Sequence, residues 1–115
     1  MMIKQQVLLT GSRREIWYAL GVAATIHAKY FTRPLIITSM LDGTHKPGSL
    51  HPEGLAVDIR TNDLPRALSD NFALELIENL RILGFDVVRE ENPRHIHIEY
   101  NPKGDRIIYT RMDIA

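Results

Sequence analysis

The chain of 115 residues contains no cysteine, so it can form no disulfide and offers no thiolate to a metal. Any metal in this protein would therefore be held by nitrogen and oxygen ligands. Charge of one sign is not in excess either, because fourteen basic residues balance fourteen acidic ones. This balance gives no indication of a nucleic acid or an acidic membrane surface as a partner.

Long apolar runs are also missing. No stretch approaches the ~18 apolar residues of a membrane span, so we expect no membrane insertion. The first six residues lack the basic and apolar segments of a signal peptide, which leads us to expect a cytoplasmic protein. The length suits one domain with a modest core, and residues 1–115 are predicted to form that single domain.

Apolar periodicity predicts two helices. The first runs from about residue 13 to residue 30, and Ser12 and Glu15 form a capping box at its start. The second follows Asn62 and Asp63, which can cap it, and ends at Gly84, with a break at 69–71 as the alternative. Its buried face is expected to hold Leu68, Phe72, Leu76, Leu80 and Leu83.

Strands are predicted at 35–39, 54–61, 85–90 and 95–100, with shorter ones at 7–10 and 107–109. The turn at 91–94 joins two of them into a hairpin. This order of elements indicates an α+β domain in which two helices pack on a mostly antiparallel sheet.

Alternating side chains gather chemical groups on one face of the predicted sheet. His95, His97 and Glu99 share a strand face, and Glu90 joins them if the hairpin pairs it with His95. Asp58 lies on the strand face that also carries Ala56.

These groups predict a metal site. His51 precedes the strand of Asp58, and Gly54 lets the backbone fold back, so His51, Asp58 and one of the two later histidines can meet. Two histidines and one carboxylate leave a coordination position for water, as in catalytic zinc sites, where the pKa of the water falls toward ~7. Glu90 is the best-placed carboxylate for a general base.

Non-haem iron oxygenases use the same three ligand types. Their chemistry normally uses a His-x-Asp/Glu spacing in a β-rich jelly roll. The separation of His51 from Asp58 by six residues, together with two long helices, argues against that class.

The pattern Ser49-x-His51-x-x-Gly54-x-Ala56-x-Asp58 resembles the zinc-binding signature of the D-alanyl-D-alanine carboxypeptidase family. That family includes D-Ala-D-Ala dipeptidases, phage endolysins and the related hedgehog amino-terminal domain. The later stretch from Asp86 to Glu90, followed by His95-Ile96-His97, is similar to the C-terminal half of the family's site. The two motifs together cover roughly residues 35–100.

The resemblance implies a hedgehog-like fold and one Zn²⁺ ion bound by His51, Asp58 and His97. It implies a carboxylate base, placed at Glu90, and a peptidoglycan stem peptide as the substrate. His95 would then steady the substrate or the charge of the transition state. Ser49 would orient the ligands.

Two positions depart from the family pattern. Arg94 stands three residues before His97, where many members have an acidic residue, so the base remains open among Glu90, Glu91 and Glu99. Many members also have an arginine shortly after the serine of the first strand. Here Met40-Leu41-Asp42 follows Ser39, and His45 or Arg60 are the candidates to replace that arginine.

These departures keep an alternative function open, namely a zinc-binding module of the same fold with little or no catalytic activity. Such a module would bind peptides or serve as a component of a phage virion. The small size, the neutral charge and the missing signal fit a phage-encoded peptidase released to the cell wall at lysis, or a virion-associated protein. The sequence names no protein partner.

Overall fold

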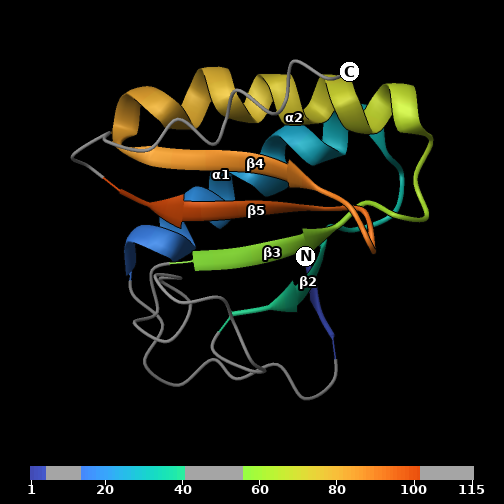
Figure 1. Ribbon diagram of the computed structural model, residues 1–115, viewed down its shortest axis with the longest axis horizontal. Coiled ribbons are helices and arrows are strands. Elements are labelled where there is room, and N and C mark those ends of the chain that lie inside the picture. Colours follow the sequence, from blue (N-terminus) through green and yellow to red (C-terminus); the bar gives the residue numbers. More distant parts are fainter. Residues whose placement is uncertain (5–13, 41–55, 102–115) are drawn as a thin grey trace.

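The structure is a computed structural model that describes residues 1–4, 14–40 and 56–101. Within these residues, two helices lie on one face of a five-stranded sheet with the strand order β1-β2-β3-β5-β4 (Figure 1). The predicted α+β class is thereby confirmed. The elements are β1 Met2–Ile3, α1 Arg14–Tyr30, β2 Ile36–Ser39, β3 Ala56–Arg60, α2 Arg66–Leu80, the 3₁₀ helix η2 Arg81–Leu83, β4 Phe85–Glu90 and β5 His95–Tyr100.

The sheet is mixed. β1 runs parallel to β2, whereas the three other pairs of neighbouring strands are antiparallel. A parallel pair needs a crossover connection, and α1 lies between these two strands in the chain. The sequence did not predict β1, because a strand of two residues is too short to show a period. The predicted strands at 7–10 and 107–109 lie outside the described residues.

The first helix buries the apolar stripe that its sequence predicts. Ile16, Leu20 and Ala23 are fully buried against the sheet and the second helix. His27 is also buried, and its ring lies 4.7 Å from that of Phe31 between ring centroids. Burial lowers the pKa of His27, and the charge of Arg33 acts in the same direction. His27 is therefore a neutral core residue.

The second helix begins later than predicted. Pro65 occupies its N-cap position in an extended conformation, and no side chain caps the helix. The prediction that Asn62 or Asp63 caps it is therefore wrong. The carboxylate of Asp63 instead accepts two hydrogen bonds, of 2.5 and 2.9 Å, from the guanidinium of Arg33. The helix continues without a break through 69–71.

The buried face of α2 agrees with the prediction in its middle and not at its ends. Phe72, Leu76 and Leu80 are fully buried, whereas Leu68 is 38% exposed and Leu83 is 45% exposed. Residues four positions apart do not lie on one straight line along a helix, because each step of four turns ~40° further around the helix axis. At the start of α2 the core is therefore contacted by Ser69, which is buried, and not by Leu68.

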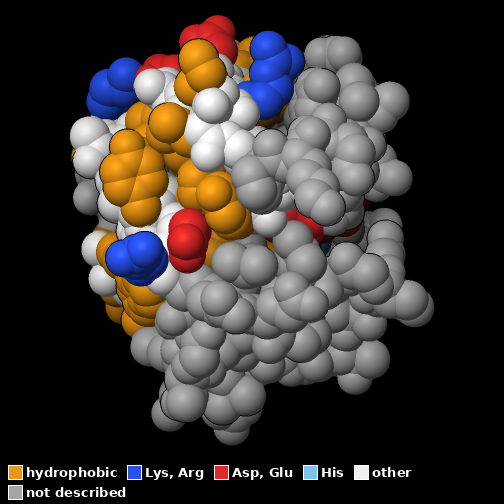
Figure 2. Space-filling view, turned by 90° about the vertical axis from the view of Figure 1, so that its left-hand side faces the viewer, with side chains coloured by type: hydrophobic (Ala, Val, Ile, Leu, Met, Phe, Trp, Pro, Cys, Tyr) orange, Lys and Arg blue, Asp and Glu red, His pale blue; other side chains and the backbone are white. Residues whose placement is uncertain are grey.

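Leu83 lies beyond the α-helix, in the 3₁₀ turn η2, where the α-helical period no longer holds. Its neighbour Ile82 is 87% exposed, and Figure 2 shows hydrophobic side chains gathered on this side of the molecule. Gly84 ends the turn in the left-handed conformation, with φ of 95°, as its predicted capping role requires.

No helix within the described ranges combines the length and the apolar character that crossing a membrane requires.

The packing of α2 gives a matched test of the core. Leu76→Ala should lower the free energy of unfolding by about 2–5 kcal/mol, because it opens a cavity in a fully buried site. Leu74→Ala makes the same change on the same helix at a side chain that is 42% exposed, and should cost about 1 kcal/mol or less. Urea unfolding measures both values. Equal losses in the two variants would contradict the placement of the core.

Candidate metal centre

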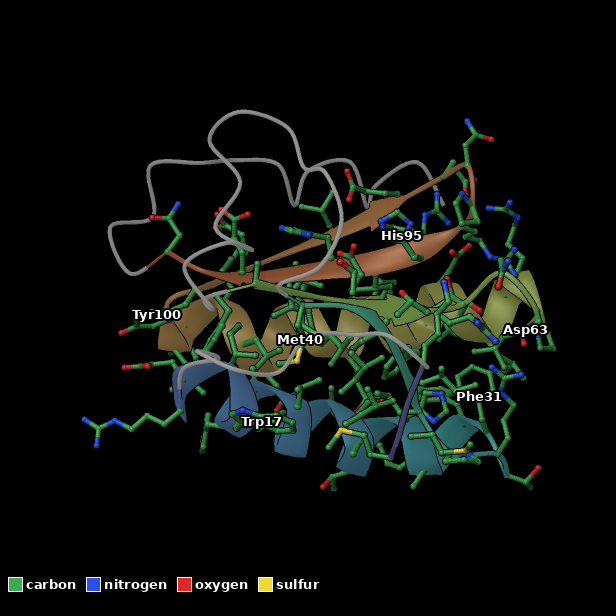
Figure 3. All side chains as sticks on the ribbon, turned by 90° about the horizontal axis from the view of Figure 1, so that it is seen from below. Trp17, Phe31, Met40, Asp63, His95 and Tyr100 are labelled. Carbon is green, nitrogen blue, oxygen red and sulfur yellow. The ribbon has the colours of Figure 1, made fainter. Side chains whose placement is uncertain are left out.

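The register of three strands assembles the candidate site on the sheet face opposite the helices. Asp58 of β3 lies directly across from His97 of β5. His95 of β5 lies between Arg60 of β3 and Glu90 of β4. The pairing of Glu90 with His95 is the one predicted for the hairpin. Figure 3 shows His95 on the side of the sheet away from the helices, whereas Phe31 lies on the helix side.

His95 is held by acceptors at both ring nitrogens. Its Nδ1 lies 2.6 Å from the carbonyl oxygen of Pro93, and its Nε2 lies 3.2 Å from Glu90 Oε1. A carbonyl and a carboxylate both require a proton on the nitrogen, so the arrangement suits the doubly protonated imidazolium. The hydrogen bond that His95 donates to Glu90 accordingly raises the pKa of His95 and lowers the pKa of Glu90.

His97 lies between two carboxylates. Its Nδ1 is 2.9 Å from Asp58 Oδ1, and its Nε2 is 2.7 Å from Glu99 Oε1. Glu99 is fully buried. A buried carboxylate that binds one nitrogen of a histidine fixes the orientation of the ring, which is how many metal-binding histidines are supported. Glu99 thus turns the Nδ1 of His97 toward Asp58.

One group in the described part of the chain has the arrangement of a metal site. Asp58, Glu90 and His95 each offer a ligand atom, and these atoms all lie within 4.8 Å of one another. His97 is not in this group, but its Nδ1 is hydrogen-bonded to Asp58, which is a member of the group together with His95. One imidazole nitrogen with carboxylate oxygens is a donor set that zinc accepts, so these residues fit the ion.

The predicted site residues fall into two sets. Asp58, Glu90, His95 and His97 meet on one face, and Arg60 lines a cleft beside them. His45, Ser49 and His51 lie outside the described residues, and their predicted roles stay predictions.

The three carboxylates that the sequence leaves as candidates for the general base lie in different surroundings. Glu90 belongs to the group with Asp58, whereas Glu91 lies on the exposed turn and pairs with Arg66 at 3.2 Å. Glu99 contacts His97 and supports its ring. Of the three, Glu90 is the carboxylate that lies in the group of possible ligand atoms.

Arg94 has a structural task at the position where an acidic residue was expected. Its guanidinium donates hydrogen bonds to the backbone oxygens of Leu64 and Thr61, the latter at 2.8 Å. These bonds tie the hairpin turn to the segment that precedes α2.

Sequence reasoning missed two features of the site. It placed Glu99 on the face of His97 but did not identify it as the support of that ring, although two residues apart on one strand is the spacing that allows such a contact. It also missed Lys4, which lines the neighbouring cleft. No signal in the sequence could have placed Lys4, since it follows a strand of two residues.

No family model matches the chain. The resemblance to the D-alanyl-D-alanine carboxypeptidase family therefore rests on the two motifs alone.

The pair of His95 and Glu90 predicts a pH dependence of stability in the metal-free protein. Because the pKa of His95 is raised in the folded state, this residue contributes fully to the free energy of unfolding below pH 6.5. The contribution is lost as the pH rises through the folded-state pKa of His95. Because the pKa of Glu90 is lowered in the folded state, this residue contributes to the free energy of unfolding above pH 4.5. The contribution is lost as the pH falls through the folded-state pKa of Glu90.

The stability difference between wild type and His95→Gln should therefore be largest between pH 4.5 and 6.5. Urea unfolding in the presence of a chelator, at about pH 5.5 and about pH 9, measures it. The same difference at both pH values would show that the two side chains do not form an ion pair.

Proposed function

We propose that this protein is a zinc-dependent peptidase that hydrolyses a peptide bond in peptidoglycan stem peptides, with the fold of the family that its motifs resemble. The observation that carries the proposal is the meeting of Asp58, Glu90 and His95 within 4.8 Å, with His97 hydrogen-bonded to Asp58. The sequence motif adds His51 as the further ligand. In this assignment His51, Asp58 and His97 hold the ion.

Zinc at such a site would polarise the carbonyl group of the substrate and lower the pKa of a water molecule. The chain itself supplies the proton transfers. A glutamate is ionised at neutral pH, and His95 lowers the pKa of Glu90 further, so the carboxylate is present to accept the proton of the attacking water. Glu90 then returns this proton to the nitrogen of the leaving amine.

His95 supplies positive charge beside this carboxylate. Its pKa is raised by Glu90, so the imidazolium form is favoured. A positive charge at this place stabilises the negative charge that develops on the substrate oxygen. Glu99 holds the ring of His97, which keeps the ligand in place while the substrate enters.

A non-catalytic zinc-binding module is the second candidate, binding peptides or serving in a phage virion. One observation favours it. Arg94 stands where an acidic residue is expected, and the backbone carbonyls of Thr61 and Leu64 occupy its guanidinium. Tight, metal-dependent binding of a stem peptide without turnover would select this candidate over the peptidase.

The role of Glu90 provides the sharpest test. Glu90→Gln should lower kcat for a stem peptide by about 10²–10⁴-fold, because glutamine cannot accept the proton. The matched control is Glu91→Gln, at the adjacent residue, whose carboxylate pairs with Arg66 on the surface. This control should keep kcat within about threefold of wild type, because surface changes away from a site have small effects. Hydrolysis is followed by chromatography of the products, with and without chelator.

The zinc content of the same variants separates two roles for Glu90. A base can be replaced without loss of the ion, so Glu90→Gln should retain zinc in equilibrium dialysis. Loss of zinc from Glu90→Gln would instead make Glu90 a ligand, together with Asp58 and His95. Absence of chelator-sensitive hydrolysis in the zinc-loaded wild type would refute the peptidase proposal.

A further inference from the structure

A groove of about 570 Å³ lies between the two helices, and this volume is within the ~300–1,000 Å³ of small-molecule sites. One wall is α1 from Trp17 to Lys29, a length of ~18 Å along the helix axis. The other wall is α2, through Glu75 and Asn79. Figure 3 shows Trp17 on the helix side of the sheet and His95 on the opposite side. A ligand in this groove would therefore not compete with one at the candidate metal centre.

The exposed apolar surface of the groove is aromatic. Of the large apolar side chains that are exposed in the described part of the chain, Tyr18 alone lines the groove, at 59% exposure. Trp17 lies next to it and packs partly against the core. A stable protein interface covers ~800 Å² of each partner around an apolar centre. One exposed ring is too small for such a centre, but it is large enough to stack on one ring of a small ligand.

The charges of the groove neutralise each other. Lys29 and Glu75 are the charged side chains among the described residues that line it, and Lys29 Nζ lies 2.5 Å from Glu75 Oε2. The hydroxyl of Tyr30 donates a hydrogen bond to the same carboxylate. Both contacts lower the pKa of Glu75, so its ionised form is favoured. A charged ligand would have to compete with this pair, whereas an uncharged ligand would not.

Gly21 keeps the middle of the groove open. It lies between Trp17 and Lys29 on the α1 wall, and a Cβ atom at this position would have no heavy atom within 4 Å. Glycine is unfavourable inside a helix, and no neighbouring atom requires a residue this small. The space over the backbone of Gly21 is therefore open to a ligand.

We propose that this groove binds an uncharged oligosaccharide. The faces of a sugar ring carry C–H groups, which suit the ring of Tyr18 and the open space over Gly21. Its edges carry hydroxyl groups, which both donate and accept hydrogen bonds and so suit the polar groups of Glu75 and Asn79. The length of the α1 wall fits several linked rings. This inference goes beyond the proposed function and does not require it.

The position of Trp17 provides the measurement. Trp17 is the only tryptophan of the chain and lines the groove, so its fluorescence reports on a bound ligand. Chitotetraose and cellotetraose, two uncharged tetrasaccharides, are titrated into the protein. At least one of them should give a saturable change with a Kd of about 1 mM or lower. The Kd should agree within about twofold with and without zinc, because distant sites act independently.

Two substitutions on α1 form a matched pair. Gly21→Leu should raise the Kd at least about tenfold, because the leucine side chain fills the open space and excludes the sugar. Ala28→Leu adds the same side chain at an exposed position of the same helix outside the groove, and should keep the Kd within about twofold of wild type. Leucine is a good helix former, so both variants should fold, which circular dichroism checks.

Tyr18→Ala tests the aromatic contact. It should raise the Kd about 3–10-fold, as expected for the loss of one stacked ring. NMR chemical shifts of the wild-type protein locate the saccharide without any substitution, and the changes should centre on α1 between Trp17 and Lys29.

Three results would overturn the saccharide groove. They are no saturable change with either saccharide up to about 10 mM, equal effects of Gly21→Leu and Ala28→Leu, and tighter binding of tetragalacturonate, a charged tetrasaccharide. Any of them would leave the peptidase proposal in place. Saccharide binding that Gly21→Leu removes would support the groove even if no peptide is hydrolysed, in which case only the peptidase proposal fails.

Discussion

The register of β3, β5 and β4 is the constraint on which the candidate site depends. It places Asp58 opposite His97, and His95 opposite Glu90, on the same side of the sheet. A slip of one residue in any of these strands would send its polar side chains to the helix face. The alternate residues prevent such a slip, because they are 1% exposed or less and belong to the core, namely Val57, Ile59, Val87, Ile96 and Ile98. The core that α1 and α2 cover therefore fixes the geometry of the opposite face.

On the polar face of the sheet, histidine side chains pair with carboxylates. His97 links Asp58 to Glu99, and His95 is bonded to Glu90, so each histidine meets at least one carboxylate. A histidine nitrogen must be free of its proton before it can bind a metal, and this competition makes metal affinity depend on pH. The same contacts keep the side chains assembled before a metal arrives, which reduces the rearrangement that binding requires.

Much of the fold could be predicted from local patterns. The bounds of β4 and β5, the pairing of Glu90 with His95 and the cap at Gly84 follow from strand alternation and turn chemistry, which act over a few residues. The start of α2 could not be predicted in this way, because the bond between Arg33 and Asp63 joins residues thirty positions apart. In the candidate site, the proximity of Asp58 and His97 could be predicted, but the support of His97 by Glu99 and the contribution of Lys4 to the cleft depend on tertiary packing that no motif encodes.

A crystal structure of the zinc-loaded protein, with anomalous diffraction data collected on both sides of the zinc absorption edge, tests the central claim most directly. We expect a single anomalous peak on the sheet face opposite the helices, in contact with Asp58 and with at least one of His95 and His97. A peak elsewhere on the molecule, or none at this face in a protein shown to bind zinc in solution, would contradict the assignment of these strands as a metal centre.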